Sequence, residues 1–126
     1  MSAIAVLQRD VRPDAGSSHP PPPPDRRCVI VRVDGEIDAA VLAEFTAALD
    51  EAVAASTRAV VVDLRRARFL SIGGALALAT AKVSASARGV DLRVIAVRRE
   101  IERVLEVTGV RPLFYWYQSV QAALEA

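Results

Sequence analysis

Short runs of branched apolar residues alternate in this chain with segments of helical periodicity, and this alternation restricts the fold more than any other feature. Residues 28–33, 60–64 and 92–97 are rich in Val, Ile and Leu and predict strands. Residues 60–64 are almost wholly apolar, as expected of a strand covered on both faces. Strands that alternate with helices imply right-handed crossovers and a largely parallel sheet.

Three amphipathic helices are predicted between and after these strands. Asp38 is placed to cap the first helix, and Ser71 is placed to cap the second helix. Gly89 is expected to end the second helix and Gly109 the third helix. The apolar positions at helical spacing are Leu42, Phe45, Leu49 and Val53 in the first helix, Ile72, Leu76, Thr80, Val83 and Ala87 in the second, and Ile101, Val104, Leu105 and Thr108 in the third.

Both ends of the chain add elements to this core. The aromatic residues 114–117 predict a final strand, and Ser119 can cap a short last helix that reaches Leu124. Residues 1–9 hold a candidate first strand, with its apolar signal at 4–8. The predicted fold class is therefore α/β, with four to five strands and about four helices.

Residues 10–27 differ in composition from the rest of the chain, because Pro20 to Pro24 are consecutive. Such a run favours an extended polyproline II segment. It is interpreted either as a flexible linker that contains a solvated His19, or as a ligand for an SH3- or WW-like groove. The main domain is expected over residues 28–126.

Composition excludes several classes of protein. An apolar fraction of 52% allows a sizeable core, and a net charge of +1 gives no electrostatic case for nucleic acid or an anionic membrane. Cys28 is the single cysteine and lies in an apolar run, so it predicts a buried thiol. The N-terminus lacks a basic, signal-like region, and Lys82 interrupts the most apolar helix. We therefore expect a cytoplasmic protein that does not insert into membranes.

Catalytic motifs are absent from the sequence. It contains no P-loop, no GxGxxG, no GxSxG and no Cys/His pair that could form a nucleophile and its base. No catalytic residue, cofactor or metal site is predicted. The pair Gly73 and Gly74 opens a helix after a strand, where backbone amides can hold a phosphate. Alternatively, these glycines let the helix start pass close to a neighbouring strand.

The segments that follow parallel strands emerge at one edge of the sheet, where open α/β sheets usually bind their ligands. This topology predicts a binding region that contains Asp38, Ser71, Ile72, Gly73 and Gly74. Five arginines also follow the strands, and they are either solvated charges or a positive rim for an acidic partner or phosphate. They are Arg65, Arg66, Arg68, Arg98 and Arg99.

Four stretches together resemble the STAS family of sulfate transporters and anti-sigma-factor antagonists, in order and spacing. Residues 31–38 (VRVDGEID) are similar to its GEhD motif, where h is hydrophobic, and residues 60–64 to its central strand. Residues 69–74 lie where the family has F-h-D-S-S-G. Residues 103–110 with Phe114 resemble its hhxxxGhxxxF segment. The resemblance implies a mixed, mostly parallel sheet whose first two strands form a hairpin.

The resemblance also implies a function, and this sequence departs from the family pattern on which that function depends. Antagonists of this family bind an anti-sigma factor that is a serine kinase, and phosphorylation of the first Ser in D-S-S-G abolishes binding. The alignment puts Ser71 at the Asp, Ile72 at the phosphoacceptor and Gly73 at the second Ser. Because isoleucine has no hydroxyl, the usual phosphoswitch is expected to be missing. Ser71 is then either a displaced acceptor or an N-cap.

Three functional hypotheses follow from these residues. The first is an anti-sigma-factor antagonist, or an antagonist-like regulator, that acts by protein–protein contact. The second is a STAS accessory subunit of a membrane transport system, such as a lipid-exporting ABC transporter. The third is a small nucleotide-binding or phosphoryl-transfer enzyme, which is disfavoured because the chain offers no metal-binding acidic pair and no general base.

Overall fold

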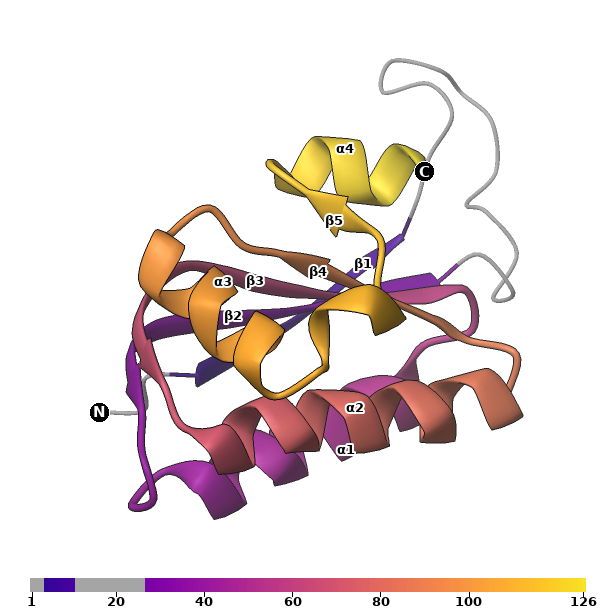
Figure 1. The fold of residues 1–126 in the computed structure, drawn as a ribbon. Helices are drawn as coiled ribbons and strands as arrows, with labels where there is room; N and C mark the ends of the chain where they lie inside the picture. Colours follow the sequence, from indigo (N-terminus) through magenta and orange to yellow (C-terminus); the bar gives the residue numbers. More distant parts are fainter. Residues whose placement is uncertain (1–3, 11–26) are drawn as a thin grey trace.

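The computed structural model describes residues 4–10 and 27–126. The proline run and both interpretations of it lie outside the described residues. The strands form one five-stranded sheet in the order β1-β2-β3-β4-β5 (Figure 1). β1 (Ile4–Asp10) pairs antiparallel with β2 (Arg27–Ile37), and all other neighbouring strands pair in parallel. The α/β class and the mixed, mostly parallel sheet are thereby confirmed.

The elements after β2 follow the predicted alternation. Two of the strands are shorter than expected. β4 has five residues and β5 has two. In chain order the remaining elements are α1 (Leu42–Ala55), β3 (Ala59–Leu70), α2 (Ile72–Ala87), β4 (Asp91–Ile95), α3 (Arg99–Val107), the 3-10 helix η2 (Arg111–Leu113), β5 (Trp116–Tyr117) and α4 (Val120–Glu125).

β2 and β3 are longer than the sequence pattern predicts. β2 continues past the predicted residues 28–33 through Asp34 and Gly35, and Gly35 has a φ of 97°. The register between the two strands shifts between Arg32 and Asp34 and again between Gly35 and Glu36. Such register shifts allow a strand to contain turn-forming residues while its pairing with the neighbouring strand continues. β3 likewise includes residues 65–70, beyond the strand predicted at 60–64.

Two hydrophobic clusters lie on the two faces of the sheet. α1, α2 and α3 pack on one face, where Val60 and Val62 of β3 belong to the larger cluster. Val61 of β3 points to the other face and packs with Ala123 of α4. Figure 1 shows α1 and α2 below the sheet and α4 above it. The first half of β3 is therefore covered on both faces, as predicted for residues 60–64.

α2 buries the face opposite to the one predicted. The expected core positions Ile72, Leu76, Thr80, Val83 and Ala87 are all exposed. The buried residues are Gly74, Ala75, Leu78, Ala81 and Ala85. Small side chains allow α2 to lie close to the sheet, so they form the packed face although they carry a weaker hydrophobic signal than Ile, Leu and Val.

The predicted ends of the later helices are present in the structure. Ser71 caps α2 and Ser119 caps α4, where the hydroxyl oxygen of Ser119 accepts the N–H of Ala122 at 3.1 Å. Gly89 and Gly109 follow α2 and α3 with φ values of 73° and 75°. These left-handed positions favour glycine and end the helices.

Candidate partner-binding site at the start of α2

The segments that leave β2 and β3 meet at the start of α2. The Ser71 N–H donates to the carbonyl oxygen of Ile37 at 2.9 Å, which ties the first residue after β3 to the end of β2. Asp38 follows, and its Oδ1 accepts the N–H of Ala40 at 3.0 Å. Because α1 begins only at Leu42, Asp38 stabilises the preceding turn and does not cap the helix as predicted.

Ser71 forms the N-cap of α2. Its backbone is extended, and its Oγ accepts the N–H of Gly74 at 3.0 Å. The Ser71 carbonyl oxygen accepts the N–H of Ala75 at 3.0 Å, which is the first hydrogen bond of the helix. The side chain therefore satisfies one of the amides left free at a helix start.

Both glycines at this helix start lie against other elements. A Cβ on Gly74 would lie 2.6 Å from Cδ1 of Leu70 and 3.0 Å from Cγ2 of Ile37. A Cβ on Gly73 would lie 2.9 Å from Cδ2 of Leu42. Close approach of the helix start to β2 and β3 therefore requires a very small residue at Gly74, whereas the contact at Gly73 is with the end of the partly buried Leu42 side chain.

Ile72 lies on the outer surface of this helix start. Its side chain is 64% exposed, although it is the first residue of α2 and is flanked by tightly packed neighbours. Asp38 and Ser71 are partly exposed beside it. The structure thus brings Asp38, Ser71, Ile72, Gly73 and Gly74 together, and we call these five residues the α2 edge.

A buried carboxylate on β3 was not predicted from the sequence to have a role. Asp63 is 4% exposed, and its two oxygens accept Nε and Nη2 of Arg65 at 2.9 and 2.8 Å. Arg32 lies 3.8 Å away. Burial alone would raise the pKa of Asp63, but the hydrogen bonds and charge of Arg65, together with the charge of Arg32, lower it below the usual 3.8. Arg65 is therefore occupied by Asp63 and is not part of a free positive rim.

We expect Asp63→Asn to lower the free energy of unfolding by about 1–2 kcal/mol near neutral pH, because the charged acceptor of Arg65 is lost. The folded-state pKa is below the unfolded value, so the ionised carboxylate stabilises the fold above about pH 4. That contribution disappears as pH falls through the lowered pKa. Urea titrations at several pH values should show the two proteins converging below pH 4. A constant difference down to pH 2 would contradict the assignment.

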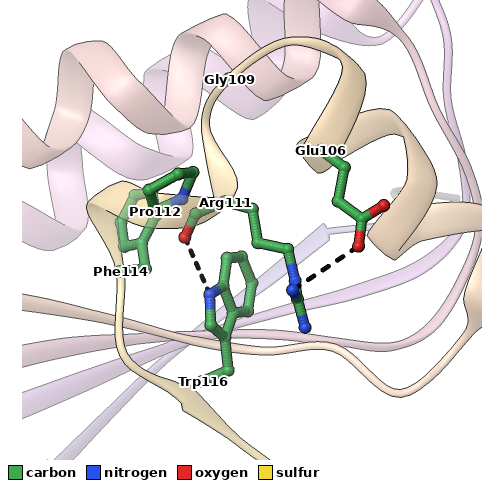
Figure 2. A pocket seen from close by; sticks show the side chains of 6 residues that line it. All are labelled: Glu106, Gly109, Arg111, Pro112, Phe114 and Trp116. Atoms are coloured by element: carbon green, nitrogen blue, oxygen red, sulfur yellow. Dashed lines mark hydrogen bonds and ion pairs between the residues drawn. The ribbon is translucent and has the colours of Figure 1, made fainter.

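A second feature missed in the sequence is an open depression beside the C-terminal strand (Figure 2). Trp116 lines it, and its Nε1–H donates to the carbonyl oxygen of Arg111 at 2.9 Å. The Arg111 guanidinium lies 3.5 Å from the Glu106 carboxylate, and the Phe114 and Trp116 rings pack edge to face at 5.7 Å. These aromatic residues were predicted to be a strand, but only Trp116 and Tyr117 pair with β4.

The described residues show no features of a metal centre or a membrane span. Within residues 4–10 and 27–126, no group of three or more His, Cys, Asp or Glu side chains could hold a metal ion. In the same part of the chain, no helix has both the length and the hydropathy to cross a membrane. Cys28 is fully buried, as predicted.

The five-stranded mixed sheet with four helices is the fold of solved anti-sigma-factor antagonists. A family model described as the STAS domain matches residues 20–123. The chain therefore belongs to the STAS domain family, as the four sequence stretches indicated. No curated protein matches it.

Solved structures resemble the chain along most of its length. An anti-sigma factor antagonist from Mycobacterium paratuberculosis is 25% identical, with a TM-score of 0.74 over 97% of this chain and 92% of that one. A putative anti-sigma factor antagonist from Thermotoga maritima is 18% identical, with a TM-score of 0.69 over 78% and 85%. A sulfate transporter family protein from Wolinella succinogenes is 20% identical, with a TM-score of 0.66 over 91% and 93%. The last two show the shared fold alone.

Proposed function

We propose that this protein is an anti-sigma-factor antagonist, or an antagonist-like regulator, that binds a serine-kinase type of anti-sigma factor through the α2 edge. The observation that carries the proposal is Ile72, which occupies the family's acceptor position with 64% of its side chain exposed. An exposed branched side chain among backbone groups fixed by Ser71 is suited to protein contact. The likeness to the mycobacterial antagonist over 97% of the chain supports this reading.

The α2 edge supports binding rather than catalysis. The Asp38 carboxylate accepts backbone N–H groups in its own turn, and the Ser71 hydroxyl accepts the Gly74 N–H. Among the described residues, no side chain is hydrogen-bonded to the Ser71 hydroxyl as a base would be. A hydroxyl without a base is a poor nucleophile, so we propose that the protein acts by contact and not by turnover.

We further propose that binding is not switched by phosphorylation at the α2 edge. Ile72 offers no acceptor oxygen, and the Ser71 oxygen is engaged as the cap of α2. A phosphate on Ser71 would have to replace that cap. The antagonist would then bind its anti-sigma factor constitutively, and any regulation would act elsewhere.

This proposal predicts that the anti-sigma kinase with ATP adds no phosphate to the wild-type protein, as measured by intact mass. Ser71→Ala should lower stability by about 1 kcal/mol through loss of the cap, without changing the phosphate count. Ile72→Ser restores the family's hydroxyl and serves as the positive control for kinase docking. A stoichiometric phosphate on the wild-type protein that Ser71→Ala removes would restore the ordinary switch.

The binding function itself is tested by calorimetric titration of the purified protein with the anti-sigma factors encoded in the same genome. A complex with one of them, at one-to-one stoichiometry, is the expected result. The alternative of a transporter accessory subunit predicts a complex with a transport ATPase or permease instead. Binding to the transport component alone would reject the regulatory proposal.

A further inference from the structure

The depression beside the C-terminal strand contains no residue of the α2 edge. It is lined by residues between 106 and 116, and its volume of about 520 Å³ lies within the roughly 300–1,000 Å³ typical of ligand sites. Figure 2 shows the Trp116 ring between Pro112 and Phe114 on one side and the ion pair of Arg111 with Glu106 on the other. The depression therefore has an apolar part, and its charged groups lie at one rim.

Two contacts hold the Trp116 ring in one orientation. Its Nε1–H donates to the carbonyl oxygen of Arg111 at 2.9 Å, and the ring packs edge to face against Phe114. Phe114 is 7% exposed and is itself held by α2, because Nζ of Lys82 lies 5.4 Å from its ring centroid. Trp116 is partly exposed, so it presents an aromatic surface that is already in position for a ligand.

An aromatic surface of this kind is suited to a polyproline II segment. Proline-rich chains bind in aromatic-lined grooves, and their extended conformation is preformed, so little entropy is lost on binding. A proline offers no N–H, but its carbonyl oxygen is a hydrogen-bond acceptor. Because the Trp116 N–H is already donated within the protein, the donor for such a carbonyl is the Arg111 guanidinium, which is 45% exposed at the rim.

The chain itself contains a segment of this chemistry. Pro20 to Pro24 are consecutive prolines, and they lie outside the described residues. Asp10 at the end of β1 pairs with Arg27 at the start of β2. The proline run is therefore tethered to the sheet at the start of β2.

The tether is long enough to bring the proline run to the depression. Val31, Val62, Val94 and Trp116 pair in one row across the sheet. Trp116 therefore lies three strands from β2 and four residues further along than Arg27, which amounts to about 20 Å at about 4.8 Å per strand and 3.3 Å per residue. Pro20 precedes Arg27 by seven residues, which span about 22 Å in a polyproline II conformation. The chain also enters β5 from the edge of the sheet where β2 begins, because the two strands run in the same direction.

We propose that the depression beside β5 is a polyproline-binding site and that its occupant is the chain's own segment 20–24. Proline rings pack against Trp116 and Pro112, and the Arg111 guanidinium donates to a proline carbonyl oxygen. The tethered run thereby competes with proline-rich segments of other proteins for the same site. This inference is independent of the proposed function, because no residue of the α2 edge takes part in it.

The first test follows the fluorescence of Trp116, which is the single tryptophan of the chain. A five-serine variant replaces residues 20–24 (P20S, P21S, P22S, P23S and P24S together). It should raise the acrylamide quenching constant of Trp116 about twofold, because the ring face loses its proline contact. Ser17→Ala with Ser18→Ala, in the same segment, is the control and should leave quenching unchanged. Equal quenching of the wild type and the five-serine variant overturns the proposal.

The second test supplies the proline run as a separate molecule. A labelled peptide with the sequence of residues 19–27 is titrated with the five-serine variant and with the wild type, and binding is followed by fluorescence anisotropy. The variant should bind the peptide at least about tenfold more tightly, because in the wild type the tethered run competes at a high effective concentration. Absence of binding to the variant, or equal binding to both proteins, contradicts the assignment.

Further variants of the five-serine protein locate the peptide in the depression. Arg111→Gln should weaken peptide binding about tenfold through loss of the charged donor, and it leaves the backbone carbonyl that holds Trp116 in place. Tyr115→Ala is the matched control, because Tyr115 is an 80% exposed aromatic residue next to Trp116 that does not line the depression. An equal loss with both variants contradicts the assignment. A wild-type dimer in sedimentation that the five-serine variant dissociates would place the proline run on a second copy and reject the contact within one chain.

Discussion

Ile72→Glu is expected to weaken binding of the anti-sigma factor by at least about tenfold, or about 1.4 kcal/mol, while the fold stays intact. The side chain is 64% exposed, so the substitution removes no core packing. A carboxylate in the first turn of α2 also interacts favourably with the helix dipole. The new charge stands where the family carries its inhibitory phosphate, so it should disfavour the same contact.

Two controls make this result specific to the α2 edge. Val107→Glu introduces the same charge at an exposed valine of α3 and should leave affinity unchanged. Ile72→Val keeps a branched apolar surface and should retain most of the binding. Thermal unfolding of Ile72→Glu should match the wild type within a few degrees. A cooperative loss of structure would mean that Ile72 contributes to the core, and unchanged affinity would remove the α2 edge from the interface.

The order of elements could be predicted from the sequence because each buried strand has a strong local signal. Val60, Val61 and Val62 are branched, adjacent and fully buried, so a run of apolar residues was enough to find the central strand. The caps at Ser71 and Ser119 were predictable for a similar reason, since a hydroxyl that accepts a nearby N–H acts within one helical turn.

The orientation of α2 could not be predicted in this way. Periodicity assigns the largest apolar residues to the core, but Leu76 and Val83 are exposed while Ala81 and Ala85 are buried. Close packing against the sheet requires small side chains, and this requirement depends on the distance between elements rather than on local sequence.

The carboxyl halves of β2 and β3 were misread for a related reason. Asp34 and Gly35 have turn chemistry, and Arg65 and Arg66 look like loop residues, yet all four lie in paired strands. Register shifts place them in the sheet, and the bidentate pair of Arg65 with Asp63 neutralises a buried charge. Pairing between residues distant in sequence decided the outcome here.

Gly74→Ala should lower the free energy of unfolding by about 2 kcal/mol, the typical cost of overpacking a buried site. The added Cβ would lie 2.6 Å from Cδ1 of Leu70 and 3.0 Å from Cγ2 of Ile37. Both neighbours are at most 1% exposed, so neither can swing into solvent to make room. The helix start must then move away from β2 and β3, which strains the Ser71 cap and the hydrogen bond from Ser71 to Ile37.

Gly73→Ala is the matched control, because it makes the same substitution one residue earlier in the same helical turn. Its Cβ would lie 2.9 Å from Cδ2 of Leu42, but Leu42 is only partly buried and can rotate toward solvent. Both variants gain similar helix propensity over glycine, so the difference between them reports the clash. Parallel urea titrations should leave Gly73→Ala within about 0.5 kcal/mol of the wild type. Equal stability of the two variants would show that the start of α2 can move away from the sheet at little cost in free energy. The α2 edge would then not be held rigidly against the sheet for its partner.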